Sequence, residues 1–122
     1  MKHSTRAQPA LARLPEVDPA IAALALWCTY RDSDAPTATQ GETILVGPEF
    51  PLLPISEQVG VIAHHVLHVA LRHSARRSAA AERHTGRFLD KQYDLACDAL
   101  VNEALLQGGH ALPRPAVRAA DI

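Results

Sequence analysis

Apolar residues recur with helical spacing in three stretches of the chain, separated by polar or proline-containing segments. The first stretch opens at Asp18, a good helix N-cap followed by proline, and continues to about Cys28. The second extends over about residues 57–76, and the third over about 91–107, where Gly108 ends it. The pattern therefore predicts about three helices.

A short β-hairpin is predicted between the first two helices. Residues 37–40 and 43–46 are rich in β-branched side chains and flank the turn Gly41-Glu42. The following segment contains Pro51 and Pro54, so we expect it to be non-helical and to present an apolar edge. Together these elements indicate an α+β fold, dominated by helices, with a small β-hairpin or sheet.

The segments outside these elements lack a sustained period. Residues 1–17 contain two prolines and scattered charges, so we expect a flexible N-terminal arm. Residues 79–87 are small and charged, which predicts a fraying helix end and a surface loop. We expect residues 18–115 to form a single domain and residues 116–122 to form a C-terminal tail.

The composition restricts the classes of partner. The 122 residues are 48% apolar, enough for one domain with a modest core. The 12 basic residues nearly balance the 13 acidic residues, so the chain has no overall positive electrostatic field that would attract nucleic acid or an anionic membrane. The longest apolar stretch, 20–27, is far shorter than the roughly 20 residues of a membrane span. We expect a cytoplasmic protein with reduced cysteines, with no nucleic acid or membrane as a partner and with a protein partner left open.

Histidines are concentrated in the second predicted helix. His64 and His68 lie four residues apart, so their side chains share one helical face and their imidazoles can reach one metal ion. For a histidine pair by itself, ordinary hydrogen-bonded core residues are the commoner explanation. His73 points elsewhere on a continuous helix and is a lesser candidate ligand if the helix breaks before it. We expect His84 and His110 to lie at the surface, without a metal.

The third predicted helix carries a polar stripe with a four-residue period: Asp90, Asp94, Asp98 and Asn102. A solvated face is the commoner origin of such a stripe. If the second and third helices pack antiparallel, however, one carboxylate can complete a His-His-Asp ligand set. Spacing alone does not distinguish Asp94 from Asp98.

Two motifs together resemble a known family. Residues 60–73 contain the pattern HHxxHxxxxH at positions 64–73, residues 95–102 contain AxDxxxN, and Pro48-Glu49-Phe50 precedes both. These stretches resemble a metallopeptidase-like domain that many bacterial proteins carry ahead of a von Willebrand factor A-like domain, in which the first motif is HExxHxxxxH. The resemblance covers about residues 18–115 and implies a zincin-like fold. No A-like domain is expected in the residues that follow.

The resemblance implies that His64 and His68 are zinc ligands, and it favours Asp98 over Asp94 as the third. Such a donor set would also accept other divalent transition metals. The chain departs from the family motif at His65, where the family has the glutamate that acts as general base. A neutral imidazole can act as a base near neutral pH, but its reach and direction differ from those of glutamate. We therefore expect a degenerate peptidase.

Three alternatives remain beside this leading hypothesis. One is an active metal-dependent hydrolase in which His65, or a nearby carboxylate such as Asp94, is the catalytic base. Another is a metal-free protein-interaction module, with histidines in its core and the apolar edge at 51–55 facing a partner. The least favoured is a haem or copper site that also uses His65, because that side chain points about 100° away from His64.

Overall fold

The structure, a computed structural model, describes residues 4–83 and 89–121. Within these ranges the chain forms five α-helices, a three-stranded sheet and two short 3-10 helices. The elements are α1 (Gln8–Val17), α2 (Pro19–Ala25), β1 (Thr29–Asp32), β2 (Ala38–Gln40), β3 (Thr43–Val46), η1 (Phe50–Leu52), α3 (Ile55–Ala70), α4 (His73–Arg83), α5 (Asp90–Gln107) and η2 (Ala119–Asp121). The α+β, helix-dominated fold is confirmed, but the number of helices is five instead of about three.

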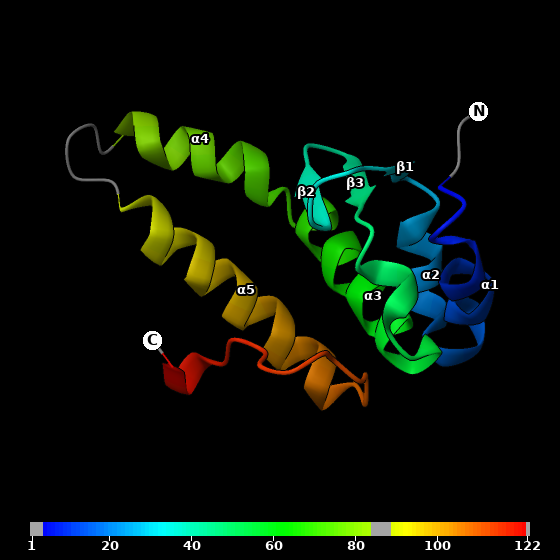
Figure 1. Cartoon of the computed structure of the whole chain (residues 1–122). Coiled ribbons are helices and arrows are strands. Elements are labelled where there is room, and N and C mark those ends of the chain that lie inside the picture. The colour runs from blue at the N-terminus through cyan, green and yellow to red at the C-terminus, as the bar shows by residue number, and fades with distance from the viewer. Residues whose placement is uncertain (1–3, 84–88, 122) are drawn as a thin grey trace.

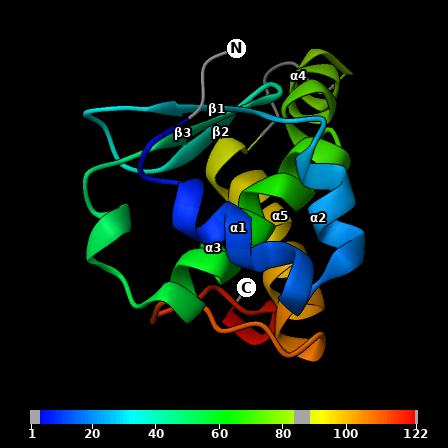
Figure 2. The same ribbon diagram turned by 90° about the vertical axis from the view of Figure 1, so that its right-hand side faces the viewer.

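Helix α3 is the centre of the fold. Helices α1 and α2 pack against one side of it and α5 against another (Figures 1 and 2). The sheet lies near the carboxyl end of α3, and β2 and β3 both contact this helix. The residues of α3 buried in this packing are Gln58, Val59, Gly60, Ile62, Ala63 and Val66. A helix with apolar residues on nearly all sides is thus covered on several sides, as its sequence predicts.

The segment predicted to be a flexible arm contains helix α1, so that prediction differs from the structure. Pro9 lies in the first turn of α1, where the missing N–H costs no helical hydrogen bond. Ala10 and Leu14, four residues apart, are fully buried, and α1 packs on α3. Burial against another helix stabilises α1 although Pro15 lies inside it, and a local pattern does not reveal such a contact.

The predicted helix over 57–76 is interrupted. Helix α3 ends at Ala70, Arg72 adopts a left-handed conformation with φ 56°, and α4 begins at His73. Neither Gly nor Asn, the usual residues at such a position, marks this break in the sequence. The irregular structure predicted from 79 is wrong as far as Arg83, because alanine-rich sequence favours helix. The remainder of that predicted loop, with His84, lies outside the described residues.

The predicted hairpin is confirmed as β2 and β3, which pair antiparallel through a turn in which Gly41 has φ 64°. A third strand was not predicted: β1 pairs parallel with β3 and makes the strand order β1-β3-β2. The first predicted helix is correspondingly shorter and ends at Ala25, not near Cys28. Tyr30 in β1 is buried and its hydroxyl donates to the Ala25 carbonyl at 2.8 Å. Parallel pairing depends on residues distant in sequence, which explains why it was missed.

The chain returns across α3 after α5. Gly109 has φ 85° in the turn that follows α5. The next segment passes so close to α3 that a Cβ atom on Gly60 would lie 1.7 Å from the carbonyl oxygen of Ala111. Only glycine permits this approach. The proline-containing segment before α3, predicted to be non-helical, instead includes the 3-10 turn η1, in which Phe50 is buried and Leu52 exposed.

Both cysteines, Cys28 and Cys97, are free thiols, as predicted. In the described part of the chain, none of the helices combines the length and apolar character that crossing a bilayer requires.

Candidate metal centre

Helix α3 places two imidazoles one turn apart. His64 and His68 are separated by four residues, and their Nε2 atoms lie 3.0 Å from each other. Both side chains are largely shielded from solvent, with 15% and 12% of their surface exposed. The two nitrogens therefore point at a common position beside α3.

Helix α5 brings a carboxylate to the same position. Asp98 Oδ1 lies 2.8 Å from His68 Nε2 and 3.3 Å from His64 Nε2. A tetrahedral zinc ion with bonds of about 2.0–2.1 Å separates its ligand atoms by about 3.3 Å, close to these distances. In the two described ranges, His64, His68 and Asp98 are the one group of three such side chains that could hold a metal ion. The contacts His64–Asn102 and His68–Asp98 also show that α3 and α5 run antiparallel, as the hypothesis required.

The electrostatics keep Asp98 ionised. Burial by itself would raise the pKa of this carboxyl, but the imidazoles of His64 and His68 beside it favour the ionised form, outweigh burial and hold the pKa well below its ordinary value. An anionic carboxylate beside two imidazoles is a donor set suited to a divalent transition metal.

Each imidazole of the pair has a partner on its other ring nitrogen. His64 Nδ1 lies 2.7 Å from Asn102 Oδ1, and His68 Nδ1 lies 2.7 Å from His73 Nδ1. Asn102 in turn donates from Nδ2 to the carbonyl of Val117 at 3.0 Å. Outer contacts of this kind orient metal-binding histidines in known proteins.

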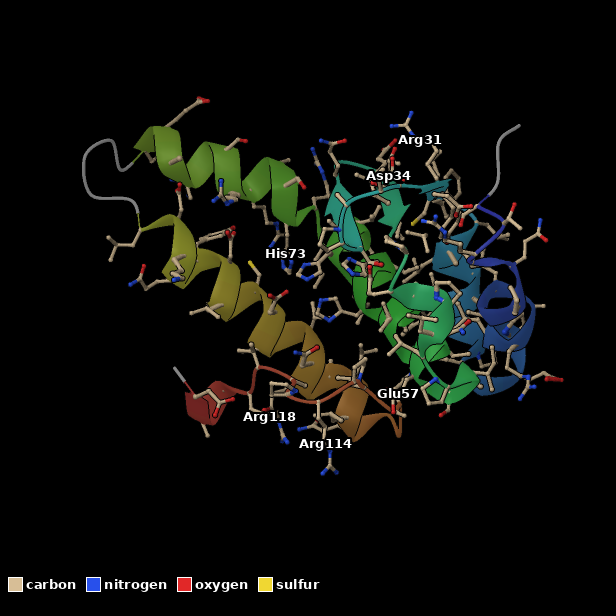
Figure 3. The ribbon with its side chains drawn as sticks, in the orientation of Figure 1. Arg31, Asp34, Glu57, His73, Arg114 and Arg118 are labelled. Atoms are coloured by element: carbon tan, nitrogen blue, oxygen red, sulfur yellow. The ribbon has the colours of Figure 1, made fainter. Side chains whose placement is uncertain are left out.

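His73 reaches the centre because of the break between α3 and α4. The left-handed Arg72 turns the chain so that the His73 ring projects from the start of α4 toward the region between α3 and α5 (Figure 3). Its contact is with Nδ1 of His68, whereas Asp98 contacts Nε2 of the same ring. Burial, with a smaller effect of His68, lowers the pKa of His73. The structure thus places His73 behind His68 and outside the His64–His68–Asp98 group.

His65, which directly follows the first histidine of the pair, points toward the sheet. Its Nδ1 lies 2.7 Å from Thr39 Oγ1 in β2. Burial, followed by the influence of His64 and His68, lowers the pKa of His65 to about 3. The ring is neutral at neutral pH, and its low pKa makes it a weak base.

Asp94, which spacing alone could not distinguish from Asp98, lies elsewhere. Its two carboxylate oxygens accept hydrogen bonds from the Arg77 guanidinium of α4, at 2.8 and 3.2 Å. Arg77 also lies 3.6 Å from Asp90. Two of the four members of the polar stripe therefore link α5 to α4, and the other two face the histidines.

The expectation that His110 lies at the surface is wrong. His110 is buried, and its Nε2 lies 2.9 Å from Asp18 Oδ2. The same carboxylate caps α2 by accepting from the Ile21 backbone N–H at 3.1 Å. The chain after α5 folds back onto the start of α2, and this long-range pairing gave no signal in the local sequence.

A cleft of about 480 Å³ opens beside the candidate centre. Its walls come from β2, from α3, from the start of α4 and from α5. His65, His68, His73 and Asp98 are among the residues that line it. Sequence reasoning identified these four residues but missed Thr39, and it recognised Asn102 only as a neighbour on the same helical face.

The chain thus combines an α+β fold with a His-His-Asp cluster formed by two antiparallel helices. A family model described as "Putative metallopeptidase domain" matches residues 2–122, so the chain belongs to this family. The match extends beyond residues 18–115 at both ends and includes α1. Neither a curated protein nor a solved structure gave a significant match.

Proposed function

We propose that this chain is a zincin-like domain that binds one divalent transition metal, with zinc as the expected ion, through His64, His68 and Asp98. The observation that carries the proposal is the convergence of two Nε2 atoms and one Oδ1 atom, separated by 3.0, 2.8 and 3.3 Å. Their helices are far apart in sequence, so local helical geometry does not explain the meeting of all three.

The chemistry of the donors supports the fit. Two imidazoles and one ionised carboxylate form a ligand set used by catalytic zinc sites, which keep a further position open. His68 and Asp98 both line the cleft, so a molecule in the cleft would reach this position. Zinc at such a site supplies Lewis acidity toward a carbonyl oxygen.

We further propose that the chain is a degenerate peptidase. In the family motif the residue after the first histidine is a glutamate that moves protons during peptide hydrolysis, contributing on the order of 10² to 10⁴ in rate. His65 occupies this position, and its Nδ1 is engaged by Thr39 of β2. We therefore expect metal binding without ordinary peptide hydrolysis.

An active metal-dependent hydrolase is the second candidate, and the cleft of about 480 Å³ beside the histidines favours it. It requires a general base other than glutamate. Asp94 lines the cleft but is held by Arg77, and His65 is held by Thr39.

The metal-free interaction module is a third candidate, supported by Leu52, which is 84% exposed on the apolar edge before α3.

Metal content tests the leading proposal. Elemental analysis of the purified protein after incubation with zinc and desalting should give about one ion per chain, and His64→Ala and His68→Ala should each give almost none. A metal at 100 times its Kd stabilises the folded state by about 2.7 kcal/mol, which corresponds to a rise in Tm of about 10 °C. Equal metal content in the parent and in His64→Ala, or no effect of chelation on Tm, would contradict the proposed metal site and favour the interaction module.

Activity tests the degenerate character. Turnover of unstructured peptides should be undetectable for the zinc-loaded parent, whereas His65→Glu should produce turnover that chelation abolishes. Substantial turnover by the parent that falls in His65→Ala would instead establish the hydrolase alternative. The metal content of His65→Glu is the control, because it separates a missing base from a missing ion.

A further inference from the structure

The two nitrogens of a histidine ring have different roles in the candidate centre. For His64, Nε2 faces His68 and Asp98, and Nδ1 faces Asn102. A neutral imidazole carries one proton, and a metal can bind only the nitrogen that lacks it. The centre therefore requires the proton of His64 on Nδ1. Asp98 acts against this arrangement, since its carboxylate lies 3.3 Å from Nε2 and attracts a proton to that nitrogen.

The surroundings of Asn102 fix the direction of its amide. Asn102 is 5% exposed, and its Nδ2 donates to the backbone carbonyl of Val117 at 3.0 Å. A carbonyl oxygen only accepts hydrogen bonds, so the NH₂ group must face Val117 and Oδ1 must face His64. The amide oxygen also only accepts, and His64 Nδ1 must therefore donate to it across 2.7 Å.

His68 has no equivalent constraint. Its Nδ1 faces Nδ1 of His73, an imidazole nitrogen that either donates or accepts according to where its own proton lies. The His68–His73 contact is therefore compatible with both proton positions on His68. Asn102, in contrast, allows only one proton position on its partner His64, namely Nδ1.

From this asymmetry we infer that Asn102 is a positioning residue of the proposed metal centre: anchored by the Val117 carbonyl, it holds the proton of His64 on Nδ1 and leaves the Nε2 lone pair aimed at the metal position. The inference rests on the proposed metal binding for its consequence, although the proton position itself is a property of the metal-free protein.

Through Asn102, the C-terminal segment is part of the proposed centre. Val117 lies beyond α5 in the segment first expected to be a tail, and Arg118 beside it is held by Glu103 of α5 at 2.6 and 3.1 Å. Glu103 also accepts from the Ala119 backbone N–H at 3.2 Å. Glu103 thus anchors the same segment as Asn102 does, with its contacts directed to Arg118 and Ala119. It supplies a matched control.

Long-range ¹H–¹⁵N NMR correlations of the metal-free protein report which nitrogen of each histidine is protonated. At about pH 8, His64 should carry a proton on Nδ1 in the parent, where it faces the Asn102 oxygen. In Asn102→Leu, which is similar in size but has no acceptor, the proton should move to Nε2, where Asp98 attracts it. In Asn102→Asp, which keeps an acceptor for Nδ1 although it loses the donor to Val117, the proton should stay on Nδ1. A parent His64 protonated on Nε2 would overturn the inference without any variant.

Zinc competition with a chromophoric chelator gives the second measurement. Asn102→Leu should bind zinc about 10–100-fold more weakly than the parent, as expected for the loss of an outer partner of a metal-binding histidine. Asn102→Asp should recover only part of this loss, because it keeps the acceptor for His64 Nδ1 but loses the donor to the Val117 carbonyl. Glu103→Ala should leave both the His64 proton position and the zinc affinity near those of the parent. An equal loss in Glu103→Ala and Asn102→Leu would overturn the inference, because it would assign the effect to a loosened C-terminal segment.

The two proposals fail separately. If the parent binds no zinc but the His64 proton moves in Asn102→Leu, the metal site is wrong and the positioning by Asn102 stands. If the parent binds zinc and Asn102→Leu changes neither the proton nor the affinity, the metal site stands and the role of Asn102 is wrong. Thermal melts of each variant confirm that folded protein is compared.

Discussion

Helices α3 and α5 both contribute to the candidate metal centre, but the rest of the protein holds them differently. Helix α3 is covered by α1, α2, α5 and the sheet, and Ile62 and Val66 in its interior face are fully buried. Helix α5 packs on α3 mainly through its second half, whereas Leu89 at its start and Leu100 on its outer face are 61% and 60% exposed.

The two helices therefore have different roles in the candidate centre. The spacing of His64 and His68 is built into one turn of a buried helix and does not depend on how α5 docks. The position of Asp98 depends on that docking, since its carboxylate meets the histidines only across the interface between α3 and α5. Helix α3 should therefore dominate the stability of the domain, and α5 should determine whether the ligand set is complete.

The largest expected effect concerns stability. Ile62→Ala removes a fully buried side chain from α3 and should lower the free energy of unfolding by about 2–5 kcal/mol. Leu100→Ala removes an exposed side chain of α5 and should change it by less than about 0.5 kcal/mol. Urea denaturation of the two variants beside the parent measures both values. Similar losses in the two variants would show that α3 has no special place in the core.

The next effect concerns the ligand set. Asp98→Asn removes the charged donor and should weaken zinc binding by at least about 100-fold, beyond the range seen for outer partners. Asp94→Asn makes the same change of charge one turn earlier on α5, where the carboxylate binds Arg77, and should leave affinity within about threefold of the parent. Competition titration compares the two. A larger loss in Asp94→Asn would reverse the assignment that the geometry favours.

The same contrast explains what the sequence could predict of the site. The histidine pair follows from a spacing of four residues on an apolar helix, because helical geometry alone brings such residues together. The third member required knowledge of how two helices pack, and spacing left Asp94 and Asp98 equal. Only the resemblance to the family distinguished them. The amide of Asn102 gained its role through Val117, whose carbonyl position no sequence pattern predicts.

The fold shows the same limit. Elements defined by local chemistry, such as the β2–β3 hairpin with its glycine turn and helix α5 before Gly108, were predicted close to their observed bounds. Elements stabilised by distant partners were missed. Helix α1 buries Leu14 and packs on α2 and α3, and β1 forms by parallel pairing with β3. The prolines in α1 locally indicated an irregular arm, and the short segment that forms β1 did not indicate a strand. In both cases tertiary contacts outweighed the local sequence pattern.

The smallest expected effect tests whether the end of α5 belongs to the same core as α3. Asp18 at the start of α2 pairs with the buried His110 beyond α5, and the hydrogen bond from His110 holds the pKa of Asp18 below its ordinary value. A carboxyl whose pKa is lower in the folded state stabilises the protein at pH values above its unfolded pKa, about 3.9. This contribution is lost as the pH falls from the unfolded pKa to the lower folded-state pKa. Asp18→Asn retains a helix-capping side chain but removes the charge, so it should lower the free energy of unfolding by about 1 kcal/mol at neutral pH.

Urea unfolding between about pH 7 and pH 3 measures this effect. The free energy of unfolding should fall less steeply with decreasing pH in Asp18→Asn than in the parent. Parallel profiles would mean that the Asp18–His110 contact adds nothing to the attachment of the C-terminal segment, which would then depend on Asn102 and Glu103.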